Sequence, residues 1–198
     1  ANGETDGVRW ASPAEAVAEL SYQRDRELLR AFLAAARPTG TLLLVRHARA
    51  GDRSSWSHDD AERPLDPVGR QQALMLAAAL AWFAPRRVFS ADRARCVQTV
   101  APLAAALGLP VEREPTLSEE AYLAHPARGR RRIRALAALG VPVVVCSQGA
   151  VIPDLVSRLA AESRLTPGRR AARKASVWAL SMVEQRLVAA DYYPDLAR

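Results

Sequence analysis

Three short apolar runs, each followed by polar residues and then by a helical pattern, constrain the fold more than any other feature of this chain. The runs are Leu42–Val45, Val88–Ser90 and Pro142–Cys146. Continuous apolar runs of this length are typical of strands buried on both faces of a parallel sheet. The alternation of strands and helices therefore predicts an α/β fold, a three-layer sandwich with a mainly parallel central sheet.

The segments between these runs carry helical periodicity. We expect helices over residues 68–83, 93–107, 133–139 and 151–161, with Gly108 and Gly140 ending the second and third. Two later apolar stretches, residues 177–182 and 187–190, favour a hairpin or edge strands. Residues 41–198 are accordingly predicted to form one domain.

Residues 1–36 have a different character. Gly7–Trp10 predicts a short strand, and Ser12 followed by Pro13 and Glu15 predicts the start of a helix. A second helical pattern follows around residues 28–33. One strand and two helices cannot close a core of their own, so we expect this extension to pack on something else.

Composition excludes several classes of protein. The formal net charge is +7, and it comes almost entirely from arginine, because Lys174 is the only lysine. The densest basic run, residues 128–134, is interrupted by apolar residues at helical spacing, so it predicts the solvated side of a helix rather than a nucleic-acid-binding arm. The two cysteines, Cys96 and Cys146, are too few for a disulfide framework. With no apolar run long enough for a membrane span and no leader pattern, we expect a cytoplasmic protein that contacts neither membrane nor nucleic acid.

Polar residues gather where the three apolar runs end. Arg46 and His47 follow the first run, Arg95 lies shortly after the second, and Ser147 and Gln148 follow the third. Ligands of open α/β sheets bind outside the carboxyl ends of the strands, so these side chains are expected to meet. Guanidinium groups hold phosphoryl oxygens in bidentate geometry, and an imidazole nitrogen can attack phosphorus. The sequence therefore predicts a phosphate site, with no metal or other cofactor.

Two motifs make the prediction more specific. Leu44-Val45-Arg46-His47-Ala48 resembles the signature of the histidine phosphatase superfamily, which includes the cofactor-dependent phosphoglycerate mutases. Ser90-x-x-x-x-Arg95-Cys96-x-Gln98-Thr99 is similar to the second motif of that family, and the residues from Arg53 to Gly69 resemble its short bacterial branch. The resemblance covers about Thr41 to Ala190 and implies a phosphoglycerate-mutase-like fold.

The resemblance also implies roles for individual residues. His47 would be the nucleophile, Arg46, Arg53 and Arg95 would line the phosphate pocket, and Glu119 would donate the proton, with Glu120 as the second choice. We further expect the substrate to contact Arg63, Ser147 and Lys174. The family places a second histidine where this chain has Gln148, whose amide can donate a hydrogen bond but carries no charge. This departure leaves open a loss of catalytic efficiency or a substrate that does not need the second imidazole. It also leaves open a non-catalytic domain that binds a phosphate or nucleotide or has a regulatory role.

Residues 1–36 resemble the last strand and closing helix of a Nudix hydrolase. The resemblance is to actinobacterial fusions in which a MutT-like Nudix domain precedes a histidine phosphatase, although no Nudix catalytic box is present. It implies a Nudix partner domain and a small-molecule substrate, with a nucleoside diphosphate such as an oxidised guanine nucleotide as the leading expectation. A phosphohistidine protein phosphatase remains the alternative.

Overall fold

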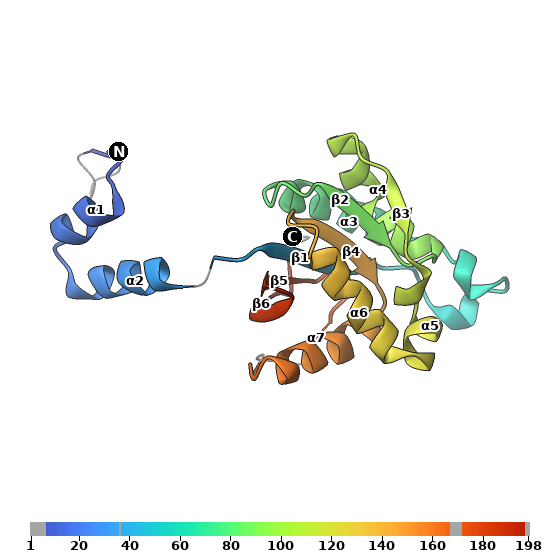
Figure 1. Cartoon of the computed structure of the whole chain (residues 1–198). Coiled ribbons are helices and arrows are strands. Elements are labelled where there is room, and N and C mark those ends of the chain that lie inside the picture. The colour runs from blue at the N-terminus through green and yellow to red at the C-terminus, as the bar shows by residue number, and fades with distance from the viewer. Residues whose placement is uncertain (1–6, 36, 167–171, 197–198) are drawn as a thin grey trace. The chain divides into compact units, whose positions relative to one another are not determined.

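The structure is a computed structural model that describes residues 7–35, 37–166 and 172–196 (Figure 1). The chain divides into two compact units, Ala1–Arg37 and Pro38–Arg198.

The first unit contains two helices, α1 (Pro13–Glu19) and α2 (Gln23–Ala34). The predicted helix start is confirmed, because the Ser12 side chain accepts a hydrogen bond from the Glu15 backbone and the Glu15 carboxylate accepts one from the Ser12 backbone. The predicted strand at Gly7–Trp10 is wrong, since these residues are exposed and have no regular secondary structure. A strand needs a hydrogen-bonded neighbour, and the described residues of this unit include none.

The second unit is built on a sheet of six strands in the order β3-β2-β4-β1-β5-β6. Strands β3, β2, β4 and β1 are parallel to one another, whereas β5 is antiparallel to β1 and to β6. This confirms the mainly parallel sheet and the C-terminal hairpin. The strands are β1 (Gly40–Arg46), β2 (Arg87–Ser90), β3 (Val111–Arg113), β4 (Val143–Ser147), β5 (Val177–Val183) and β6 (Arg186–Tyr193).

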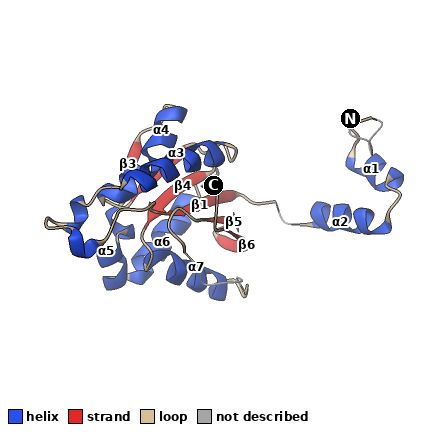
Figure 2. Ribbon diagram, turned by 180° about the vertical axis from the view of Figure 1, so that it is seen from behind, coloured by secondary structure: helices blue, strands red, loops and turns tan. Residues whose placement is uncertain are grey.

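The sheet has a hydrophobic core on each face, as expected of a three-layer sandwich. Leu43 and Val45 of β1 point to a core shared with two helices, whereas Leu42 and Leu44 point to the opposite core. Figure 2 shows helices on both sides of the sheet. The first core includes residues of α3 (Pro67–Ala81) and α4 (Ala94–Leu107), and the second includes residues of α5 (Glu119–Ala124), α6 (Pro126–Ala137) and α7 (Val151–Glu162).

Most helix boundaries lie within two residues of those predicted. The exception is α6, which begins at Pro126, seven residues before the expected start. Proline suits the first turn of a helix, where its missing N–H has no intrahelical acceptor, so the basic run 128–134 lies within this helix. Among the described residues, no helix is long and apolar enough to cross a bilayer.

The parallel strands bring distant parts of the sequence to one edge of the sheet. Arg46 at the end of β1 pairs in register with Ser147 of β4, and Ser90 of β2 pairs with Cys146 of β4. Because the three strands run in the same direction, the loops that follow them emerge side by side. The candidate site lies at this edge.

Candidate active site

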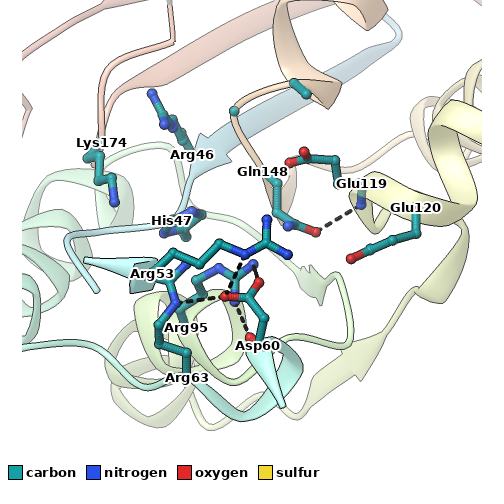
Figure 3. Close-up of a pocket in the computed structure, with 12 residues that line it drawn as sticks. Arg46, His47, Arg53, Asp60, Arg63, Arg95, Glu119, Glu120, Gln148 and Lys174 are labelled. Carbon is teal, nitrogen blue, oxygen red and sulfur yellow. Dashed lines mark hydrogen bonds and ion pairs between the residues drawn. The ribbon is translucent and has the colours of Figure 1, made fainter. Parts of the chain in front are cut away.

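A polar cavity of about 300 Å³ opens at the carboxyl edge of the sheet (Figure 3). In this view His47 and Gln148 lie between Lys174 on one side and Glu119 and Glu120 on the other. Eight of the nine predicted site residues line the cavity: Arg46, His47, Arg53, Arg63, Arg95, Glu119, Gln148 and Lys174. Glu120, the second choice for the proton donor, lines it too, together with three residues that had no predicted role, Asp60, Gly149 and Ala150.

His47 directly follows β1 and is held in one orientation. Its backbone N–H donates to the Ser147 carbonyl at 3.0 Å, which continues the pairing of β1 with β4. The ring nitrogen Nδ1 lies 2.8 Å from the Ala48 carbonyl oxygen. A carbonyl oxygen only accepts, so Nδ1 carries the proton and Nε2 bears the free lone pair. The geometry therefore selects the tautomer that a nucleophilic Nε2 requires.

The protonation state of His47 suits the same chemistry. Burial lowers the pKa of His47 to about 3, even though the hydrogen bond to Ala48 opposes the change, and the nearby cations Arg95, Lys174 and Arg46 lower it further. The side chain is only 5% exposed. The imidazole is consequently neutral at neutral pH, and its lone pair is available without prior loss of a proton.

Arg46 occupies the cavity wall against the loop that follows β4. Its Nη1 donates to the Ala172 carbonyl, and its Nε is buried without a hydrogen-bond partner among the described residues. A Cβ atom on Gly149 would lie 2.7 Å from Nη2 and 2.8 Å from Cζ of this guanidinium. Glycine at position 149 thus allows the arginine to lie flat on the backbone, with Nε left to bind an anion.

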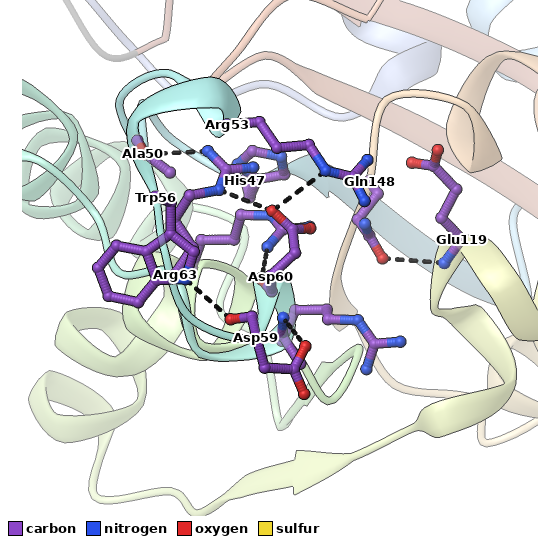
Figure 4. Close-up of polar contacts among 12 residues, drawn as sticks. His47, Ala50, Arg53, Trp56, Asp59, Asp60, Arg63, Glu119 and Gln148 are labelled. Atoms are coloured by element: carbon purple, nitrogen blue, oxygen red, sulfur yellow. Dashed lines mark hydrogen bonds and ion pairs between the residues drawn. The ribbon is translucent and has the colours of Figure 1, made fainter.

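Three arginines, Arg53, Arg63 and Arg95, contact the carboxylate of Asp60 in the 3₁₀ helix η2 (Asp60–Glu62). Figure 4 shows Arg53 and Arg63 beside this carboxylate, and Figure 3 shows Arg95. Arg63 Nε donates to Oδ1 at 2.8 Å, Arg95 Nη2 donates to Oδ2 at 3.0 Å, and Arg53 Nε lies 3.6 Å from Oδ1. Burial alone would raise the pKa of Asp60, but the hydrogen bond from Arg63 and the arginine charges outweigh it and lower the pKa below its usual value.

Sequence reasoning missed Asp60, although one local signal was available. Asp60 and Arg63 are three residues apart, the spacing of neighbours on a helical turn. The contact with Arg95 joins η2 to α4 and is visible only in the tertiary structure.

Gln148 connects two parts of the cavity. Its Oε1 accepts a hydrogen bond of 2.8 Å from the Glu119 backbone N–H at the start of α5. Because an N–H can only donate, the amide oxygen must face Glu119, and the amide nitrogen is directed elsewhere. Gln148 is 4% exposed and lines the cavity, so its NH₂ group is a neutral donor for a bound anion.

The two glutamates at the start of α5 differ in their contacts. Glu120 accepts a hydrogen bond of 2.7 Å from Arg93. Burial acts to raise the pKa of Glu120, but hydrogen bonds from its own backbone and from Arg93 outweigh this effect, and the pKa is lowered. Within the described part of the chain, the Glu119 carboxyl has no recorded hydrogen bond or ion pair. Of the two glutamates, Glu119 is thus the one whose carboxyl group is not held by Arg93.

The remaining two predicted contacts have different outcomes. Lys174 lines the cavity, where burial and the charges of Arg46, Arg63 and Arg95 lower its pKa. Ser147 does not line it, because its buried hydroxyl donates to the Leu117 carbonyl at 2.7 Å. Ser147 thereby ties the end of β4 to the turn before Glu119 instead of facing a ligand.

The walls of the cavity also include the beginning of α7. Gly149 and Ala150 line it directly before the first residue of this helix. Backbone N–H groups at a helix N-terminus favour anions. In the described ranges, no group of three or more His, Cys, Asp or Glu side chains is arranged to hold a metal ion.

Comparison with known proteins agrees with this geometry. Residues 42–138 match the family model for the histidine phosphatase superfamily (branch 1). An 8-oxo-(d)GTP phosphatase of Mycolicibacterium smegmatis is 41% identical over 191 residues, which is 96% of this chain. The chain spans about 59% of the length of that relative.

Solved structures share the fold at low sequence identity. A mycobacterial glucosyl-3-phosphoglycerate phosphatase in complex with VO3 has a TM-score of 0.61 and 20% identity, covering 78% of this chain and 98% of that one. The protein histidine phosphatase SixA in complex with tungstate has a TM-score of 0.61 and 21% identity, covering 77% of this chain and 94% of that one. With its motifs, its fold and these matches taken together, the chain belongs to the histidine phosphatase superfamily.

Proposed function

We propose that this chain hydrolyses phosphate monoesters, or the terminal phosphate of a nucleotide, through a covalent phosphohistidine on His47. The observation that carries the proposal is the state of that imidazole. Nδ1 is bound to the Ala48 carbonyl, the pKa is lowered to about 3, and Nε2 has a free lone pair at the cavity. A neutral, oriented imidazole is the form that attacks phosphorus.

In the first step the Nε2 lone pair forms a bond to phosphorus while the bond from phosphorus to the leaving oxygen breaks. Arg46 and Arg95 hold non-bridging oxygens through their unpartnered Nε groups, and the amide of Gln148 donates a neutral hydrogen bond. Glu119 in its protonated form gives its proton to the leaving oxygen, so that the product departs as a neutral hydroxyl.

In the second step a water molecule attacks the phosphohistidine. The Glu119 carboxylate accepts a proton from this water as the new bond between oxygen and phosphorus forms. The bond between Nε2 and phosphorus breaks, its electron pair returns to the ring, and orthophosphate leaves. Both steps use the same carboxyl group, first as acid and then as base, as microscopic reversibility suggests.

We propose a nucleoside phosphate as the substrate class. The support is the 41% identity to a protein named 8-oxo-(d)GTP phosphatase and the cationic lining of the cavity. We also infer that residues 41–198 form the phosphatase domain and that residues 1–36 are an N-terminal extension, in line with the division of the chain after Arg37.

The test is phosphate release by the full chain from a panel of nucleoside di- and triphosphates, sugar phosphates, p-nitrophenyl phosphate and a phosphohistidine peptide. His47→Ala should abolish turnover with a folded protein, since no other group replaces Nε2. The wild type should form an acid-labile, alkali-stable phosphoenzyme. Glu119→Gln should lower kcat much more than its neighbour control Glu120→Gln. Undiminished turnover in His47→Ala would refute the proposal.

A further inference from the structure

We propose that Asp60 is a positioning residue that orients the guanidinium of Arg95 toward the transferring phosphate. The inference rests on the proposed function of this cavity, and it assigns a role to a carboxylate whose side-chain partners are the arginines Arg53, Arg63 and Arg95. Two hydrogen bonds from Arg95 to Asp60 support this inference. So do the hydrogen bonds by which Arg63 connects Asp60 to the loop after β1.

The contacts to Arg95 involve one edge of its guanidinium. Arg95 Nη1 donates to the Asp60 backbone carbonyl at 2.5 Å, and Nη2 donates to Asp60 Oδ2 at 3.0 Å. These two nitrogens form the end of the planar group. The adjacent edge contains Nε and the second hydrogen of Nη2, and in the described part of the chain the buried Nε has no hydrogen-bond partner.

The free edge is what an anion needs. The Arg95 side chain is only 3% exposed, so its Nε has been removed from water without a hydrogen bond in return. Such a group is costly unless a ligand satisfies it. Because Arg95 also lines the cavity, a phosphoryl group bound there can accept from Nε and Nη2 as a bidentate pair.

Asp60 is itself held in place by Arg63. Arg63 Nε donates to Asp60 Oδ1, while Arg63 Nη1 donates to the carbonyls of Ala50 and Gly51 at 2.9 and 3.1 Å. The loop after β1 is thus connected through Arg63 and Asp60 to Arg95 on α4. His47, the proposed nucleophile, lies on that same loop. These contacts therefore fix the position of the Arg95 guanidinium relative to His47.

An opposing idea is that Asp60 mimics the substrate and blocks the cavity until displaced. The contacts argue against it, because a substrate mimic would occupy the free edge of Arg95 and satisfy Nε. The two ideas predict opposite changes in phosphate affinity when the Asp60 carboxylate is removed. Loss of the carboxylate weakens phosphate binding if Asp60 positions Arg95, and strengthens it if Asp60 competes with phosphate.

The experiment compares Asp60→Asn with Glu62→Gln in the full chain. Glu62 lies two residues away in η2, and its exposed carboxylate makes no hydrogen bond or ion pair with the residues that the structure describes. Its variant therefore has the same change in charge and measures the long-range effect alone. Binding of inorganic phosphate is measured by calorimetry, and kcat and KM are measured on p-nitrophenyl phosphate. We expect the phosphate dissociation constant of Asp60→Asn to rise about 10- to 100-fold, the loss expected for one or two charge-assisted hydrogen bonds. Glu62→Gln should stay within about twofold of the wild type.

A double-mutant cycle separates positioning from general stability. In the Arg95→Ala background, Asp60→Asn should weaken phosphate binding by less than about threefold, because the group it orients is already absent. Asp60→Glu, which keeps the charge, should recover part of the affinity, and melting temperatures report whether each variant is folded. If Asp60→Asn does not fold, Asp60→Glu and the cycle built on it take its place.

The outcomes distinguish this inference from the proposed function. Tighter or unchanged phosphate binding in Asp60→Asn overturns the positioning role, as do full additivity with Arg95→Ala and a wild type that binds no phosphate. A wild type that binds phosphate but releases none from any substrate overturns the proposed function alone. In that case a weakened affinity in Asp60→Asn still supports the role of Asp60.

Discussion

The depressed pKa of His47 makes the stability of the fold depend on pH in a way that can be measured. In the folded chain the pKa is about 3, whereas the ordinary value is 6.5. As pH falls below 6.5, the unfolded chain binds a proton at this residue that the folded chain does not accept. The folded-state pKa is depressed, and the neutral form is the one that burial favours. His47 therefore leaves stability unaffected above about pH 7 and destabilises the fold increasingly as pH falls toward 3.

The magnitude follows from the two pKa values. Each pH unit in this window corresponds to about 1.4 kcal/mol for a group that titrates in only one of the two states. Between about pH 8 and about pH 5, His47 should reduce the free energy of unfolding by about 2 kcal/mol. Because the side chain is only 5% exposed, solvent screening offsets little of this effect.

The assay is urea unfolding at several pH values between 5 and 8 in a phosphate-free buffer, with the wild type compared with His47→Gln. As the pH is lowered from 8 to 5, the free energy of unfolding of the wild type should fall by about 2 kcal/mol more than that of the variant. His125→Gln is the matched control, because it removes an exposed imidazole between α5 and α6 and should follow the wild type. If the free energy of unfolding depends on pH in the same way in the wild type and in His47→Gln, the conclusion that the buried His47 is neutral is refuted.

Two further substitutions test the anion site. Arg95→Lys keeps the charge but removes the planar fork, so kcat/KM should fall by an amount equivalent to about 1–3 kcal/mol. An Arg95→Lys variant as active as the exposed control Arg128→Lys would contradict the bidentate role. Gln148→His places an ionisable ring in the cavity, and turnover of p-nitrophenyl phosphate should rise about tenfold toward acidic pH, where the ring becomes cationic. A pH profile identical to that of the wild type would show that charge at this position does not limit the reaction.

The mainly parallel character of the sheet could be predicted because apolar runs and turn residues are local signals. Two apolar runs, Leu42–Val45 and Pro142–Cys146, predict buried strands. The structure has β1 at the first run and β4 at the second, each within two residues of the expected bounds. The short strand β3 carries no such signal, since Val111–Arg113 is three residues long and two of its three residues are charged. The predicted strand at Gly7–Trp10 had the right residue types but no partner strand, and pairing is a tertiary property.

The meeting of His47 with Arg46, Arg95 and Gln148 could also be predicted, because the carboxyl ends of parallel strands lie at one edge of a sheet. The sequence could not show which of the two adjacent glutamates has a carboxyl group held by another residue. That depends on the hydrogen bond from Arg93 to Glu120, two residues that lie 27 positions apart in the sequence.

The sequence by itself thus determined the residue types at the site and the edge of the sheet at which they gather. Only the tertiary structure decided their chemical states. The Ala48 carbonyl sets the tautomer of His47, burial keeps its ring neutral, and Ser147 turns toward Leu117 instead of the cavity. Asp60 illustrates the reason, because its partner Arg95 lies 35 residues away in the sequence, on α4. Burial, and the contacts of Ser147 with Leu117 and of Asp60 with Arg95, arise from packing between distant segments, and residue order does not encode them locally.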